Sequence, residues 1–232
     1  MRIDKFIASG GIYSRKEASQ MARRGLVTCN GKPVKDLSMH IDEEKDVIAV
    51  NGEILNYSKY SYVMLNKPDG YISSTEDSGR TVMKLLPPEC EKIGMFPCGR
   101  LDIDTHGLLI ITNDGPTAHR LLSPNHHAKK KYYFKCSVPL DEAKVNELES
   151  GICIGDYTTK PCSVEMLGPN EGYIILGEGK FHQIKRMMEA VGSSVVYLKR
   201  IAFGGIELDE SLKEGEFRYL TEEEIEILTS NK

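Results

Sequence analysis

The sequence predicts an α+β protein, with a small N-terminal module followed by a mixed, mostly antiparallel sheet. Three observations support this fold class. Strand-like segments outnumber helical ones, several of them are joined by hairpin turn signals, and the 232 residues suffice for one large and one small domain. No run of about 18 apolar residues occurs, so we expect no membrane span.

The first fifty residues are typical of a compact module. Apolar residues within 3–7 share one helical face. Residues 14–17, Ser-Arg-Lys-Glu, form a capping box for a second helix, which Gly25 should end. Asn30-Gly31 and Asn51-Gly52 are hairpin turn signals that follow short strand-like runs.

A polar stretch at 56–61 predicts a linker, so we divide the chain into a module at 1–56, a linker at 57–61 and a larger domain at 62–232. Turn signals follow the first two strands of the larger domain, at 67–70 and 113–115. Its predicted strands are 62–66, 107–112, 130–137, 173–176 and 195–198. Its predicted helices are 141–150, 183–191 and one that follows a capping box at 221–224.

The six cysteines are scattered and form no Cys-x-x-Cys pair. This pattern argues against a metal or redox site and favours reduced thiols in a cytoplasmic protein. The N-terminus lacks the apolar core of a signal peptide, which agrees with that compartment.

The charge distribution is uneven, although the net charge is only −4. Residues 1–35 carry eight Lys/Arg and two acids, whereas residues 207–232 carry nine acids and three Lys/Arg. Local charge governs binding to a polyanion, so the basic module is a candidate RNA surface. The alternative is a solvated helix face. The candidate RNA-binding residues are Arg15, Lys16, Arg23, Arg24 and Lys32.

Residues 99–107, Gly-Arg-Leu-Asp-Ile-Asp-Thr-His-Gly, place two carboxylates and an arginine directly before an apolar strand. If this segment is extended, Asp102 and Asp104 point the same way. If it is a tight loop, only one of them reaches a cleft. A third interpretation is a turn in which Asp104 and Thr105 bond to the local backbone. Spacing alone leaves these alternatives open.

Two further segments carry candidate chemistry. His126 and His127 lack a third metal ligand at a suitable spacing, but the lysines at 129–131 before Tyr132 suit RNA. In the segment 177–188, Lys185 and Arg186 lie in the first turn of a predicted helix, where the dipole disfavours cations unless an anion lies nearby.

Together these segments resemble the RsuA-type ribosomal RNA pseudouridine synthases. The resemblance runs through residues 64–71, 99–105, 123–127 and 182–187 in family order and covers almost the whole chain. The first module resembles the alpha-L type RNA-binding domain that often precedes this catalytic domain. The larger domain is therefore expected to have the pseudouridine synthase fold.

The resemblance implies roles for individual residues. Asp102 matches the catalytic aspartate, Tyr132 the tyrosine that stacks on the target base, and Lys185 the cation that pairs with the aspartate. The expected substrate-binding residues are Arg100, Leu198, Lys130 and His182. Asp104 is expected mainly to shape the loop. The reaction has no redox step, so we expect no cofactor and no metal.

The expected function is isomerisation of one uridine in 16S ribosomal RNA by a monomer that acts on ribosomal RNA or on an assembling small ribosomal subunit. The alternatives are the same reaction on 23S rRNA and a non-catalytic RNA-binding or assembly factor. A third alternative is a metal-dependent hydrolase that uses Asp102, Asp104 and Asp114, since carboxylates suit magnesium.

Overall fold

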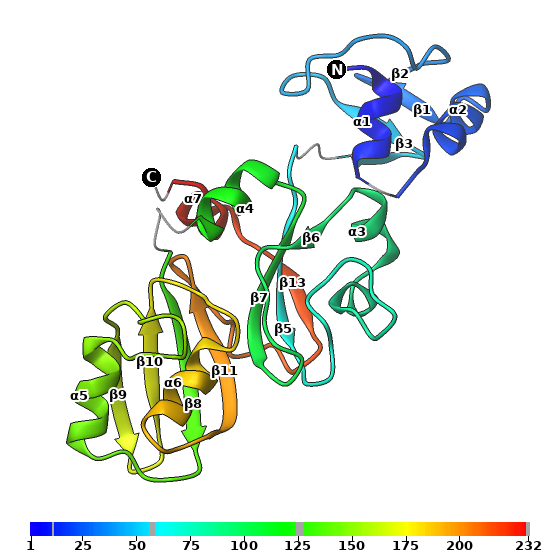
Figure 1. The fold of residues 1–232 in the computed structure, drawn as a ribbon. Helices are drawn as coiled ribbons and strands as arrows, with labels where there is room; N and C mark the ends of the chain where they lie inside the picture. Colours follow the sequence, from blue (N-terminus) through cyan, green and yellow to red (C-terminus); the bar gives the residue numbers. More distant parts are fainter. Residues whose placement is uncertain (11, 56–58, 124–127, 231–232) are drawn as a thin grey trace. The chain divides into compact units, whose positions relative to one another are not determined.

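The computed structural model describes residues 1–10, 12–55, 59–123 and 128–230 (Figure 1). Contacts divide the chain into two compact units, Met1–Ser61 with Pro87–Met95, and Tyr62–Leu86 with Phe96–Lys232. The short helix α3 (Pro88–Lys92) therefore groups with the first unit, although its sequence position lies within the predicted larger domain. The predicted boundaries at 56 and 62 stay predictions.

The first unit contains two helices, α1 (Ile3–Ser9) and α2 (Arg15–Arg23), and a small antiparallel sheet. The strand order is β2-β1-β3-β4. The strands are β1 (Val27–Cys29), β2 (Lys32–Pro33), β3 (Ile48–Val50) and β4 (Glu53–Leu55). Apolar residues of both helices and of β1 and β3 form its core, as the pattern at 3–7 predicts.

The local signals of this unit are confirmed. The backbone N–H of Glu17 donates to Ser14 Oγ at 3.2 Å, and the Ser14 N–H donates to the Glu17 carboxylate at 2.7 Å, which completes the capping box. Gly25 follows α2 with φ of +76°, and Asn30 and Gly31 both have positive φ between β1 and β2. These backbone conformations explain the Gly and Asn residues at the turns.

The second unit is built on a sheet that has nine strands among the described residues, in the order β13-β5-β7-β11-β8-β10-β9, with β12 beside β11 and β6 beside β7. Among the strand pairs of this sheet that the structure describes, only β7 with β11 is parallel, which confirms the mostly antiparallel sheet. The strands are β5 (Tyr62–Lys67), β6 (Phe96–Pro97), β7 (His106–Thr112), β8 (Lys130–Cys136), β9 (Ser163–Gly168), β10 (Glu171–Leu176), β11 (Val195–Phe203), β12 (Ile206–Glu207) and β13 (Phe217–Tyr219).

The helices of this unit are α4 (Gly115–Leu122), α5 (Glu142–Ser150), α6 (Gln183–Ala190) and α7 (Glu222–Ser230), with a 3₁₀ turn η1 (Val82–Leu85). The prediction of a plain turn at 113–115 missed α4, because Asp114 is its N-cap and accepts from the Thr117 N–H. The pattern also missed β9 and stopped β11 five residues early. Bulges interrupt the pairing of β11 with β8, so its side chains do not alternate regularly.

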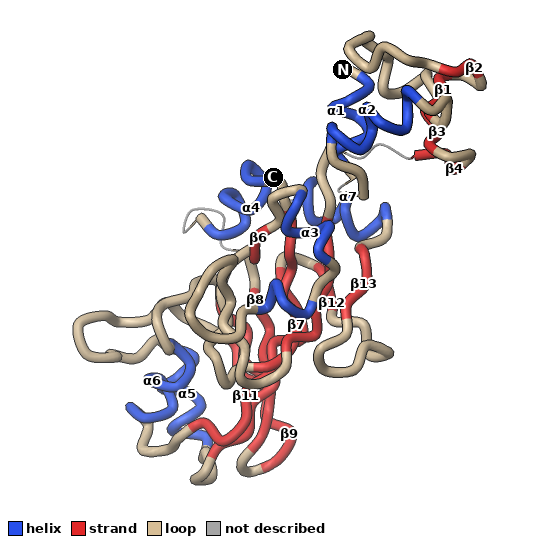
Figure 2. Tube along the Cα trace, turned by 90° about the vertical axis from the view of Figure 1, so that its right-hand side faces the viewer, coloured by secondary structure: helices blue, strands red, loops and turns tan. Residues whose placement is uncertain are grey.

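Helices α5 and α6 cover one face of the β9-β10-β8-β11 part of the sheet (Figures 1 and 2). Their inward residues Leu148, Ile184, Met187 and Met188 pack against Phe134 of β8 and its neighbours. This packing holds α6 against the sheet. No helix among the described residues is long and apolar enough to cross a membrane.

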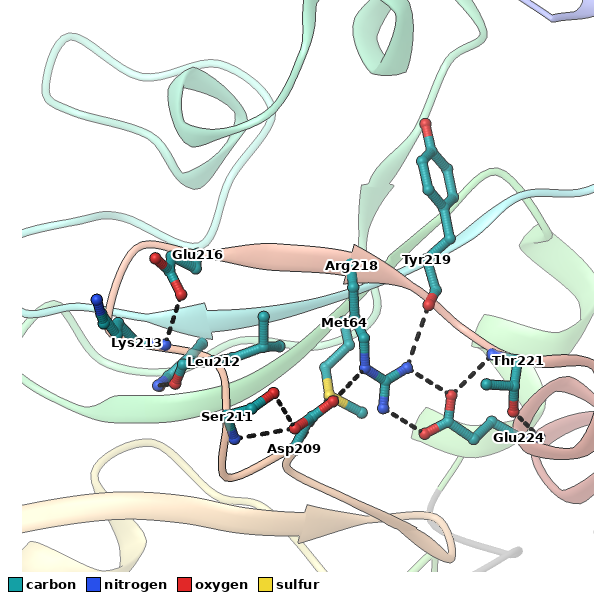
Figure 3. A network of polar contacts seen from close by, with 11 residues as sticks. Met64, Asp209, Ser211, Leu212, Lys213, Glu216, Arg218, Tyr219, Thr221 and Glu224 are labelled. Carbon is teal, nitrogen blue, oxygen red and sulfur yellow. Dashed lines mark hydrogen bonds and ion pairs between the residues drawn. The ribbon is translucent and has the colours of Figure 1, made fainter.

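The acidic C-terminal region is tied together by one arginine (Figure 3). Arg218 of β13 donates from Nε to Asp209 at 2.6 Å and from both Nη atoms to Glu224 at 2.7 Å. Glu224 also accepts from the Thr221 N–H, which confirms the predicted capping box before α7. Two of the acidic residues of this region, Asp209 and Glu224, therefore hold β13 and α7 together through Arg218.

Gly107 is the second residue of β7 and lies at the parallel contact between β7 and β11. Its φ is +99°, and a Cβ at this position would lie 2.2 Å from the carbonyl oxygen of Arg200. We expect Gly107→Ala to lower the free energy of unfolding by roughly 3 kcal/mol or more, since backbone must move. Urea unfolding measures the change. The control is Gly115→Ala, where a Cβ meets nothing within 4 Å, and an equal loss in both variants would contradict the prediction.

Candidate active site

The segment 99–105 between β6 and β7 is a tight loop, so the extended alternative is wrong. The Thr105 N–H donates to the Asp102 carbonyl at 3.0 Å, which closes a turn. Leu101 is buried, and its backbone N–H and C=O both bond to the Ser73 hydroxyl. Side chains therefore do not alternate here, and the two aspartates differ in exposure, at 29% for Asp102 and 57% for Asp104.

A cavity of about 730 Å³ lies beside this loop. Asp102 lines it and Asp104 does not. The other lining residues include all the catalytic and substrate-binding candidates of this domain, namely Arg100, Lys130, Tyr132, His182, Lys185 and Leu198. The fold thus brings together residues that are up to 98 positions apart in the sequence. Their individual roles stay predictions.

Lys185 joins both aspartates, which corrects the expectation that it would pair with Asp102 alone. Its Nζ donates to the two carboxylate oxygens of Asp104 at 2.6 and 2.8 Å and lies 3.5 Å from Asp102. Burial would raise the pKa of Asp104, but the hydrogen bond and charge of Lys185 lower it below its usual value. Asp104 therefore forms the shorter of the two contacts with Lys185, which the expectation of a mainly loop-shaping residue did not include.

His182 lies on the other side of Asp102. It is the N-cap of α6, in the left-handed region at φ of +51°, and its Nε2 lies 3.6 Å from Asp102 Oδ1. The neighbouring ring of Phe181 stacks on it with centroids 3.8 Å apart. Lys185 lies one turn further along α6, so this first turn meets the anion that the sequence predicted for it.

Tyr132 and Leu198 lie on neighbouring strands and line the cavity from the sheet. Tyr132 of β8 is half-buried and pairs with Arg200 of β11, whereas Leu198 is buried in the core under α6. A cavity lined by an aromatic ring, a carboxylate and an apolar side chain suits a planar heterocycle.

Lys67 is a residue that the sequence did not single out. It ends β5, is fully buried, and its Nζ donates to four backbone carbonyl oxygens, those of Pro68, Asp102, Ile103 and Thr105, at 2.8 to 3.1 Å. Burial lowers the pKa of Lys67 to about 8. The signal available in the sequence was a lysine at the end of a strand whose first four residues are apolar or aromatic. It clamps the loop that carries Asp102.

The metal-dependent alternative loses one of its proposed ligands. Asp114 caps α4 and accepts a hydrogen bond from the Tyr62 hydroxyl at 2.5 Å, so it serves the packing of α4 against β5. Within residues 1–10, 12–55, 59–123 and 128–230, no group of three or more His, Cys, Asp or Glu side chains is arranged to hold a metal ion. His126 and His127 lie outside the described residues.

The basic candidates of the first unit are all exposed. Arg15, Lys16, Arg23, Arg24 and Lys32 project from α2, its C-terminal edge and β2. None of them forms an ion pair with a carboxylate of the described residues, so their charges are free to meet a polyanion.

Comparisons with known proteins agree with this geometry. A family model described as RNA pseudouridylate synthase matches residues 61–190, and an S4 domain model matches residues 1–48. "Uncharacterized RNA pseudouridine synthase YtzG" of Bacillus subtilis is 45% identical over 98% of both chains. "Ribosomal small subunit pseudouridine synthase A" of Escherichia coli is 38% identical over 97% of this chain and 98% of that protein. A solved structure entitled "Crystal structure of pseudouridylate synthase" is 38% identical, covers 98% of this chain and 99% of its own, and gives a TM-score of 0.70.

Proposed function

The chain belongs to the RNA pseudouridylate synthase family, and from this we propose that it converts one uridine of 16S ribosomal RNA to pseudouridine. The observation that carries the proposal is Asp102, a carboxylate that lines a cavity, with Lys185 at 3.5 Å and Tyr132 on the cavity wall. The relative named for the small ribosomal subunit, which matches nearly the whole chain, supports 16S over 23S rRNA.

The reaction breaks the bond between the ribose and N1 of uracil, turns the base and joins its C5 to the ribose. The proton on C5 leaves, and N1 gains one. An ionised carboxylate is required while the glycosidic bond is broken. In this proposal Asp102 supplies it, Lys185 places a positive charge 3.5 Å from it, and Tyr132 stacks on the flipped base. Arg100, Lys130, His182 and Leu198 bind the nucleotide.

The test is direct mapping of pseudouridine in 16S and 23S rRNA from cells that lack the protein, and in unmodified rRNA incubated with it. We expect one uridine in 16S rRNA to lose its modification in the cells and to regain it in the tube. A site in 23S rRNA alone, or no site, would contradict the proposal. Running the assay on naked 16S rRNA and on assembling subunits decides whether ribosomal proteins are needed.

We further propose that the protein works as a cytoplasmic monomer, with its basic N-terminal module docked on RNA. The six cysteines are all free thiols, which supports a reducing compartment.

Replacing Arg15, Lys16, Arg23, Arg24 and Lys32 together by glutamine should weaken RNA binding and flatten its salt dependence. Each lost phosphate contact lowers the slope of log K against log salt by about 0.7 on single strands. Filter binding over a salt series measures this. The control replaces the exposed Lys84 and Lys213, and an unchanged slope in the five-residue variant would remove the role given to the module.

A further inference from the structure

Two basic side chains with little solvent exposure line the same cavity as Asp102. Arg200 of β11 is 2% exposed, and Lys130 at the start of β8 is half-buried. Both cations lie over the ring of Phe203, at 4.9 and 5.6 Å from its centroid. They therefore form one cluster, defined here as the Lys130–Arg200 pair.

No carboxylate of the described residues forms an ion pair with either cation. Arg200 donates from Nε to the Leu108 carbonyl at 2.7 Å, and one of its Nη atoms is buried without a partner in the described part of the chain. Lys130 donates to the Ala128 carbonyl at 2.8 Å. A buried guanidinium such as that of Arg200, next to a second, half-buried cation, is costly unless an anion joins them.

Glu178 also lines this cavity, and its carboxylate already accepts hydrogen bonds from three donors. Its carboxylate accepts from the Tyr157 hydroxyl at 2.6 Å, the Lys160 N–H at 2.9 Å and the Gln183 amide at 2.8 Å. Burial and the neighbouring charge of Arg200 lower the pKa of Lys130 to about 8, which agrees with a local shortage of negative charge.

We propose that Lys130 and Arg200 form a subsite for one phosphodiester of the RNA, at or next to the uridine that is isomerised. The proposal rests on the function proposed above, since it places the phosphate relative to a base on Tyr132. Lys130 and Tyr132 lie on the same face of β8, two residues or about 7 Å apart, the order of the separation between a base and its own backbone. A guanidinium and an ammonium both bind phosphate oxygens, whereas a neutral uracil carbonyl would leave both charges uncompensated.

The test replaces single phosphates near the target uridine by neutral methylphosphonates, one RNA at a time. Binding is measured to protein carrying Asp102→Asn, so that no turnover intervenes. We expect one position to weaken binding about ten- to hundredfold, and the same position to have no effect when Lys130→Met is added. The matched control is Lys131→Met, the next residue on the opposite face of β8, which should retain the full effect.

If the methylphosphonate weakens binding of Lys130→Met as much as it weakens binding of the protein with Lys130, the two changes act independently. That result would overturn the subsite. Competition by inorganic phosphate is a second arm. If phosphate competes with wild type but not with Lys130→Met, and no RNA position matters, the site takes a free anion and the RNA assignment is wrong. Arg200→Lys tests the second cation, with thermal unfolding as the check on folding.

The outcomes separate this proposal from the function on which it rests. A methylphosphonate effect that vanishes in Lys130→Met, in a protein that makes no pseudouridine, would support the subsite and contradict the function. Normal pseudouridine formation without any position-specific methylphosphonate effect would support the function and contradict the subsite.

Discussion

Asparagine in place of Asp102 should reduce pseudouridine formation at least about 10³-fold while RNA binding and the urea midpoint change little. The amide keeps the shape of the carboxylate but removes the charge that acts while the glycosidic bond is broken. The Asp102 side chain is partly exposed, and asparagine has nearly the same size, so the replacement should leave no void in the core. Single-turnover assays on unmodified 16S rRNA measure the rate.

Asp104→Asn is the matched control, because both aspartates contact Lys185 and only Asp102 lines the cavity. The asparagine can still accept a hydrogen bond from Lys185, so we expect activity within about tenfold of wild type. Equal losses in the two variants would contradict the assignment of Asp102 as the catalytic carboxylate. A larger loss for Asp104→Asn would reverse it.

Lys67→Met should lower both stability and activity. It removes the donor that four backbone carbonyls share, three of them in the loop of Asp102. Carbonyls left buried without donors should lower the free energy of unfolding by about 3 kcal/mol or more. A displaced loop should also cost about 10²-fold in rate. Urea unfolding and single-turnover kinetics measure both, with the exposed Lys84→Met as control.

The stability difference between wild type and Lys67→Met should depend on pH. Burial lowers the pKa of Lys67 in the folded state from 10.5 to about 8, so the unfolded chain binds more protons between these values. Stability then rises with pH through that window, and below pH about 8 the cost of burying the charge is fully present. The free energy of unfolding of wild type minus that of Lys67→Met should therefore increase from pH 8 to pH 10. A decrease over this range would contradict a lowered pKa of Lys67 in the folded state.

Much of the fold could be predicted from the sequence because its signals are local. The Ser14 capping box, the Asn-Gly turns and the Thr221 capping box each depend on a few neighbouring residues, and all are confirmed. The same local signals misread residues 113–115, because Asp and Gly open a helix as readily as they close a strand. Only the packing of Asp114 against Tyr62 settles which occurs.

For the candidate site, too, local sequence signals predicted one part and the tertiary structure was needed for the rest. The sequence by itself determined the family, the order of the motifs and Asp102 as the residue to test, since these depend on residue type and spacing. The tertiary structure alone decided that the loop at 99–105 is tight, that Lys185 joins both aspartates and that Lys67 clamps the loop. It also decided that Arg200 and Lys130 share the ring of Phe203 and form no ion pair with a carboxylate of the described residues. The partners in the contacts of Lys185 and Lys67 with this loop lie 35 to 83 residues apart, and burial gives the contacts of Lys67 and Arg200 their strength. The spacing of residues along the chain predicts neither which distant residues come into contact nor how deeply they are buried.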